Sequence, residues 1–256
     1  MFRKLCFLAV GLFVAGTIFS ASARSLPKEV PSEPNQTKIT LQHKHTENCA
    51  ETSAEPVHII CILDRSGSMN GLTEDTIGGY NSFLDKQKQN PGKAEVTTIL
   101  FDDQYEIISE SVDINEAKHL TSEEYFARGS TALLDALGRT ISNTLGNMEK
   151  EKICPAKRRV LFLIMTDGLE NASKEYKKSA VKSLIETTAK KYDWNYIFIC
   201  ANIDSVSEAT SLGINAKNAA NYSHDSDGVQ KSFSMMDSVA TEVREKGSID
   251  ENWRHH

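Results

Sequence analysis

The chain has 256 residues, of which 39% are hydrophobic and 25% are charged, and its formal net charge is -6. This is the composition of an ordinary globular protein, and it excludes a collagenous, disordered or polytopic membrane protein. The acidic balance, with no basic stripe to offset it, also argues against a nucleic-acid partner, because a negative surface repels phosphate backbones.

Residues 1–23 have the anatomy of a secretory signal peptide. Arg3 and Lys4 precede an apolar run from Leu5 to Phe19, and the small residues of 21–23 follow it. The apolar run is short and poorly flanked for a transmembrane span. We therefore expect an exported product, periplasmic or secreted, with no stable transmembrane anchor; an uncleaved anchor is the alternative interpretation.

Residues 24–55 are predicted to form a flexible leader. The segment is rich in Pro, Ser, Glu, Gln and Thr, and it has no hydrophobic period that would bury a face. His43, His45 and Cys49 are candidate ligands for a soft metal, but their spacing matches no standard zinc pattern. We favour a solvated linker here.

From Val57 onward, short β-rich runs alternate with longer helical patterns, which predicts an α/β domain with a mostly parallel sheet. Only Asp103 and Gln104 separate the second and third strands, which predicts an antiparallel hairpin with the third strand at an edge. Residues 247–256 are predicted to be a frayed tail. The expected strands are 57–64, 95–102, 105–112, 159–166, 195–202 and a weaker one at 219–222, and the expected helices are 73–89, 131–149, 175–191 and 228–246.

Oxygen-bearing side chains follow three separate segments of this pattern. The first strand runs into Asp64-Arg65-Ser66-Gly67-Ser68, and alternate residues of an extended segment project the same way. The fourth strand ends at Asp167, and a glycine-relieved loop presents Thr131. Open α/β sheets bind ligands beyond the carboxyl ends of their strands. We therefore expect two carboxylates and three hydroxyls to meet at one edge of the sheet.

This donor set indicates a hard divalent cation, because it contains oxygen atoms and neither imidazole nor thiolate. So few carboxylates, supplemented by hydroxyls and waters, favour octahedral Mg2+. Calcium usually collects more carboxylates and is therefore less favoured, but Mn2+ and Ca2+ stay open.

Asp64-x-Ser66-x-Ser68, Thr131 and Asp167 resemble the metal-ion-dependent adhesion site (MIDAS) of the von Willebrand factor A (VWA) domain family, in order and in strand context. The resemblance covers roughly residues 56–246. It implies a Rossmann-like, doubly wound sheet of six strands in the order 3-2-1-4-5-6, with strand 3 antiparallel and helices on the flanks.

The resemblance also implies roles for these residues. Ser66, Ser68 and Thr131 would contact the metal directly, whereas Asp64 and Asp167 would act mainly through bound water. An acidic side chain of a partner protein would complete the coordination. The function implied is an exported, metal-dependent protein-binding module for adhesion or assembly, without enzymatic activity.

Three alternatives stay open at this point. Ser68, Ser130 or Thr131 could cap helices while Asp167 and Gly168 form a plain turn, so that no metal is involved. The fold could also carry a non-functional metal site and serve as a scaffold. A magnesium-dependent phosphohydrolase is the third, but aspartyl-phosphate enzymes commonly need a second Asp two residues after the nucleophile, where this chain has Ser66.

The four cysteines beyond the signal segment divide into two pairs. Cys61 and Cys200 fall within strands one and five, which strand four separates, so we expect buried free thiols. Cys49 and Cys154 precede strands one and four and could meet at the sheet edge opposite the metal. We predict a disulfide bond between them.

Several other polar residues have open interpretations. Asp102 and Asp103 either border the metal or form a solvated hairpin tip. Asp204 is interpreted as a helix cap, and His224 lies in a polar loop without a nucleophilic pattern. The basic cluster at 157–159 is predicted to be a solvated end of the sheet.

Overall fold

The computed structural model describes residues 56–250 and 252–255. The expected signal peptide (1–23) and leader (24–55), with His43, His45 and Cys49, lie outside this part of the chain. The strands are β1 (Val57–Asp64), β2 (Ala94–Phe101), β3 (Tyr105–Asp113), β4 (Val160–Thr166), β5 (Asn195–Cys200) and β6 (Ala219–Asn221). The helices are α1 (Thr73–Gln89), α2 (Leu133–Glu151), α3 (Lys178–Tyr192), α4 (Ser205–Ser211) and α5 (Ser226–Lys246), with 3-10 turns η1 (Gly67–Met69), η2 (Ala216–Asn218) and η3 (Trp253–His255).

The six strands form one sheet in the order β3-β2-β1-β4-β5-β6. Every neighbouring pair is parallel except β2 and β3, which are antiparallel. The predicted topology is thus confirmed, with β3 at an edge. All residues of β1 and β4 are buried, as expected for central strands that helices cover on both faces.

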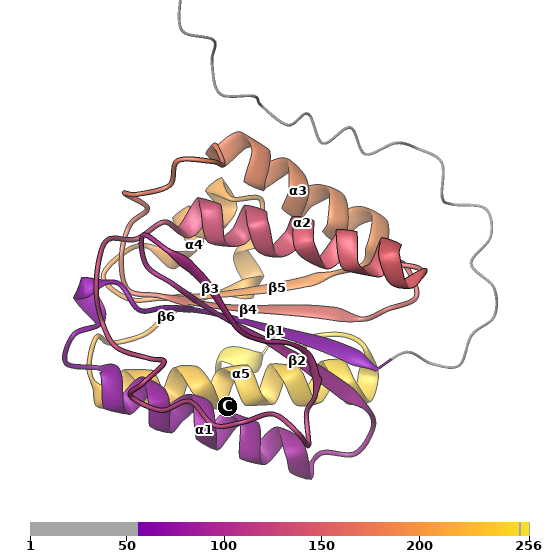
Figure 1. The fold of residues 1–256 in the computed structure, drawn as a ribbon, viewed down its shortest axis with the longest axis horizontal. Coiled ribbons are helices and arrows are strands. Elements are labelled where there is room, and N and C mark those ends of the chain that lie inside the picture. Colours follow the sequence, from indigo (N-terminus) through magenta and orange to yellow (C-terminus); the bar gives the residue numbers. More distant parts are fainter. Residues whose placement is uncertain (1–55, 251, 256) are drawn as a thin grey trace, which may run out of the picture. The chain divides into compact units, whose positions relative to one another are not determined.

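Helices α1 and α5 cover one face of the sheet, and α2 and α3 cover the other (Figure 1). Strand β1 alternates between the two cores, because successive side chains of a strand point to opposite faces. Ile59 and Leu63 pack with Phe83 and Val229 of α1 and α5. Ile60 and Ile62 pack on the opposite face with apolar residues of α2 and α3. The carboxyl ends of β1 and β4 are thereby fixed side by side.

Two helices begin later than the sequence pattern predicts. Helix α2 begins at Leu133 rather than 131, and α3 begins at Lys178 rather than 175. The backbone N–H groups before α3 bond to a side chain instead of forming a helix, because Asp135 accepts hydrogen bonds from those of Lys174, Glu175 and Tyr176. Asp135 and its partners thereby tie the start of α2 to the loop before α3.

Helix α4 was not predicted, because seven residues give too little apolar periodicity to recognise. Its cap was predicted correctly: Asp204 Oδ1 accepts from the backbone N–H groups of Val206 and Ser207.

The expectation of a frayed tail over residues 247–256 is wrong for Trp253. Its side chain is buried in the α1–α5 core, and its Nε1 donates to the carbonyl of Lys217 at 3.0 Å. A tryptophan buries a large apolar area and needs one partner for its N–H, and this position provides both. Trp253 is therefore anchored against the domain.

Cys61 and Cys200 are buried free thiols, as predicted. Cys154 is disulfide-bonded. Its predicted partner Cys49 lies outside the described residues, so the pairing stays a prediction. Within residues 56–250 and 252–255, no helix has the length and apolar character needed to cross a bilayer.

Candidate metal-binding site

Asp64 ends β1 with both carboxylate oxygens engaged. The backbone N–H of Ser66 donates to Asp64 Oδ1 at 2.7 Å, and the hydroxyl of Thr166, the last residue of β4, donates to Oδ2 at 2.6 Å. The first contact closes the turn after β1, and the second ties it to the neighbouring strand. The carboxylate is therefore held in one orientation at the carboxyl edge of the sheet.

The two serines of the Asp-x-Ser-x-Ser turn lie next to the second aspartate. Ser66 Oγ is 3.1 Å from Ser68 Oγ, and Ser68 Oγ donates to Asp167 Oδ1 at 2.5 Å. These contacts join the end of β1 to the end of β4, although 99 positions separate Ser68 from Asp167 in the sequence. The alternation predicted from an extended segment does not continue to Ser68, because Gly67–Met69 form a 3-10 turn, and this turn brings Ser68 beside Asp167.

Thr131 reaches the same place from the loop before α2. A Cβ atom added to Gly168 would lie 3.2 Å from Thr131 Oγ1 and 3.7 Å from Ser68 Oγ, so both hydroxyls border this glycine. Asn171 fixes the threonine backbone, since its Oδ1 accepts from Thr131 N and its own N–H donates to Thr131 O. The structure thus brings all five predicted residues together.

The hydroxyls do not serve as helix caps. The residues at the N-cap positions of η1, α1 and α2 are Ser66, Leu72 and Ala132, and none of them makes a side-chain capping bond. The capping interpretation is therefore wrong.

Burial makes this arrangement electrostatically costly for the protein alone. Asp64 and Asp167 are both buried. Burial raises the pKa of Asp64 to about 6, although hydrogen bonds from Thr166 and Ser66 act in the opposite direction. A cation among the oxygens would offset this penalty, because an adjacent positive charge favours the ionised carboxylate.

The donors present suit such a cation. Two carboxylates and three hydroxyls are hard ligands, and they leave room for waters in a six-coordinate shell. Across the described residues, no group of three or more His, Cys, Asp or Glu side chains could hold a metal, so the hydroxyl contribution is essential to this candidate site.

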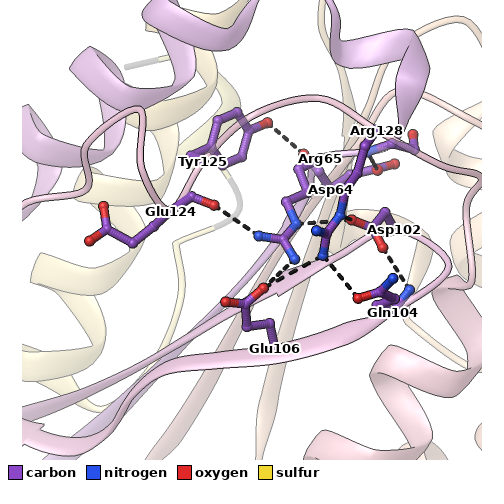
Figure 2. Close-up of polar contacts among 9 residues, drawn as sticks. Asp64, Arg65, Asp102, Gln104, Glu106, Glu124, Tyr125 and Arg128 are labelled. Atoms are coloured by element: carbon purple, nitrogen blue, oxygen red, sulfur yellow. Dashed lines mark hydrogen bonds and ion pairs between the residues drawn. The ribbon is translucent and has the colours of Figure 1, made fainter.

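Arg65, the residue between Asp64 and Ser66, is fully buried and extends into an ionic network with Asp102, Glu106 and Arg128 (Figure 2). Its Nε donates to Asp102 Oδ2 at 3.0 Å, one terminal nitrogen donates to the carbonyl of Glu124 at 2.8 Å, and the other pairs with Glu106. Arg128 also donates to Asp102 Oδ2, at 2.7 Å. Asp102 is accordingly buried between two arginines, so the interpretation as a solvated hairpin tip is wrong for Asp102, whereas Asp103 is exposed.

This network holds the loop that carries Thr131. The N–H of Arg128 donates to the carbonyl of Arg65, the N–H of Gly67 donates to that of Gly129, and the N–H of Ala132 donates to that of Asp102. The φ angle of Gly129 is +65°, a conformation that favours glycine. The position of Thr131 therefore depends on contacts on both of its sides along the chain.

The sequence patterns did not identify His224 as part of this site. Its Nε2 lies 2.8 Å from Asp167 Oδ2, the carboxylate oxygen that Ser68 does not use. A signal was available: the residue follows β6, and residues that follow parallel strands gather at the same edge of the sheet. The strand is only three residues long and the loop is polar, which hid the relation.

Comparison with known proteins gives structural matches only. No protein-family model matches the sequence, and no curated protein sequence matches it. The solved structure of proximal thread matrix protein 1 from the mussel byssus matches with a TM-score of 0.52 at 14% identity, over 75% of this chain and 50% of that one. A form with a zinc-occupied MIDAS motif matches at 13% identity with the same TM-score, over 75% of this chain and 50% of that one.

The fold is that of a VWA domain. The strand order and the antiparallel β3 agree with what the resemblance implied. The pilus adhesin SpaC from Lactobacillus rhamnosus GG also matches this chain, with a TM-score of 0.52 at 11% identity, over 76% of this chain and 31% of the adhesin. The chain thus spans half or less of the length of these structures.

Proposed function

We propose that this VWA domain is an exported protein-binding module that holds a divalent metal ion and presents it to an acidic side chain of a partner. One observation carries the proposal: Asp64, Ser66, Ser68, Thr131 and Asp167 converge from three segments at one edge of the sheet. The carboxylates are buried, and the hydroxyls are not used as caps. This is the arrangement expected of a metal site that recognises carboxylates.

The surroundings support a protein as the ligand. Leu169, two residues after Asp167, is 59% exposed. An exposed apolar side chain beside a cation suits a partner that combines an acidic residue with an apolar neighbour, because a single charge-assisted contact needs a surrounding interface to become specific.

Mg2+ is the ion we propose, with Mn2+ or Ca2+ as alternatives. Ser66, Ser68 and Thr131 would contact it directly, and Asp64 and Asp167 would act mainly through water. When bound, the ion supplies a Lewis-acidic position for the incoming carboxylate. The zinc-occupied MIDAS reported for the mussel protein shows that such sites can accept other divalent ions.

Export is part of the proposal and depends on residues 1–23, whose sequence has the order of a signal peptide. Cleavage after the small residues at 21–23 would release the leader and the VWA domain to the periplasm or the exterior. N-terminal sequencing of the protein from a secreting host tests this, and an intact Met1 would contradict it.

Calorimetric titration of the purified protein with Mg2+, Mn2+ and Ca2+ tests the metal site. We expect saturable one-site uptake by the wild type and none by Ser66→Ala or Thr131→Ala. Ser109→Ala, which removes a hydroxyl from β3, is the matched control and should behave as wild type. Uptake that is equal in all four proteins would contradict the assignment.

Partner recognition is tested by capture from an extract of the source cells, with and without a chelator. A partner retained by wild type with metal, and lost both with chelator and with Thr131→Ala, is the expected result. Retention of every captured protein under all conditions would contradict metal-dependent recognition.

A further inference from the structure

We propose that His224 is a positioning residue of the metal site, which fixes the carboxylate of Asp167 by donating a hydrogen bond to it. The proposal rests on the proposed metal-binding function and assigns a part of it to the loop between β6 and α5. Three observations lead to it: the contact itself, the comparison with the other carboxylate, and the anchoring of the loop.

The contact joins a ring nitrogen to a carboxylate oxygen. His224 Nε2 lies 2.8 Å from Asp167 Oδ2. The imidazole tautomer that carries its proton on Nε2 donates to this oxygen, because a carboxylate oxygen is an acceptor. Ser68 occupies the other oxygen, Oδ1, at 2.5 Å. The two donors together fix the rotation of the carboxylate group, and therefore the direction in which it faces the neighbouring hydroxyls.

Asp64 shows the same pattern with different donors. Its two oxygens accept from the Ser66 backbone N–H and from the hydroxyl of Thr166. Both acidic residues of the site are thus held at both oxygens. His224 does for Asp167 what Thr166 does for Asp64, except that the histidine comes from a loop far along the chain and its side chain is 29% exposed.

The loop between β6 and α5 is held in place on both sides of His224, which fixes the position of the imidazole. The N–H of Tyr222 donates to the carbonyl of Cys200 at the end of β5. Asp225 caps α5 by accepting from the N–H of Gly228 at 2.7 Å, and a side chain at Gly228 would collide with the carbonyl of Ser223 at 1.9 Å. The residues on both sides of His224 are therefore fixed to the sheet and to α5.

Groups that orient the ligands of a metal affect affinity strongly, and their loss typically lowers metal affinity about 10- to 100-fold. We expect His224→Ala to weaken binding of Mg2+ and of Mn2+ about 10-fold. His224→Gln keeps an N–H donor at a similar reach and should stay within about threefold of wild type. Rescue by glutamine separates a positioning role from a loss of packing.

The chain offers a matched control in His119, whose Nε2 lies 2.8 Å from Asp85 Oδ1. This is a histidine–aspartate pair of the same length that shares no residue with the candidate site, so His119→Ala should leave metal affinity unchanged. Thermal unfolding of each metal-free protein verifies that the variants fold.

Titration calorimetry with Mg2+ and Mn2+, on wild type and the three variants, decides the matter. Wild-type affinity in His224→Ala, or equal losses in His224→Ala and His224→Gln, would overturn the positioning role while leaving the metal site standing. A loss in His224→Ala confined to Mn2+ would also overturn it, because it would indicate direct nitrogen coordination. Absence of uptake by wild type would overturn the proposed function as well.

Discussion

The buried histidine of β1 predicts how the stability of the domain depends on pH. His58 Nε2 lies 2.8 Å from Thr97 Oγ1 on β2, and its Nδ1 is buried with no partner among the described residues. Burial, and secondarily the charge of Arg158, lowers the pKa of His58 from 6.5 to about 3. The folded domain therefore keeps this imidazole neutral over most of the acidic range.

The sign of the effect follows from proton uptake. The unfolded chain binds a proton at His58 near pH 6.5, whereas the folded chain does so only near pH 3. Between these values the unfolded state binds more protons, so the free energy of unfolding falls as pH falls and is fully retained above 6.5. At about 1.4 kcal/mol per pH unit, the loss is about 3 kcal/mol at pH 4.5.

Asp64 acts in the opposite direction and has to be separated from His58. Its pKa is raised from 3.8 to about 6, so the folded state takes up its proton first and gains stability as pH falls through this range. The comparison that isolates the histidine is wild type against His58→Gln, whose side chain does not titrate.

Urea unfolding of both metal-free proteins at pH 7.0 and pH 4.5 measures the effect. We expect the stability difference between wild type and His58→Gln to shift by about 3 kcal/mol toward the variant at the lower pH. Stability curves that stay parallel between the two pH values would refute the reasoning, because they would mean that the imidazole titrates normally in the fold.

Four further substitutions test the packing of the domain and of the site. Arg65→Met removes a fully buried guanidinium from the buried carboxylate of Asp102. We expect this change to lower the free energy of unfolding, measured in urea, by about 3–5 kcal/mol. Gly78 lies in open space on α1, so Gly78→Ala should stabilise the domain by about 0.5–1 kcal/mol. A Cβ at the next position would lie 2.3 Å from a phenylalanine ring of α5, so Gly79→Ala should destabilise the domain by about 1–3 kcal/mol. Thermal melts that rank the two variants in the opposite order would contradict the packing described. Gly168→Ala places a methyl group among the site hydroxyls and should abolish metal uptake in calorimetry without loss of fold.

The central strands were predictable because both of their faces are buried. The apolar run of β4 and the β-rich run of β1 mark their bounds within one residue, and the short connection between β2 and β3 favours an antiparallel pair. Helix starts were less predictable, because side chains distant in the sequence, such as Asp135, compete for the backbone there. The seven-residue α4 and the buried Trp253 gave no periodic signal.

Charged residues were the main source of error outside the site. The cluster at 157–159 was predicted to be solvated, yet Arg158 is buried and pairs with Glu95 of β2. Asp102 is likewise buried, between Arg65 and Arg128. A charged residue is usually exposed unless a partner of opposite charge is buried with it. The partners of these residues lie tens of positions away in the chain, so the local sequence does not reveal them.

The Asp-x-Ser-x-Ser turn shows why the candidate site was predictable and its support was not. Asp64 and Ser66 project the same way because side chains alternate along an extended chain, a rule that needs no knowledge of the partners, whereas Ser68 reaches them through the 3-10 turn at Gly67–Met69. The same alternation sends Arg65 the other way, where its role depends on Asp102, Glu106 and the segment before Thr131. The motif thus has two roles. Asp64, Ser66 and Ser68 supply oxygen ligands, and Arg65 holds the loop that carries Thr131. Changes at Arg65 should therefore weaken the site through Thr131, although Arg65 contributes no ligand.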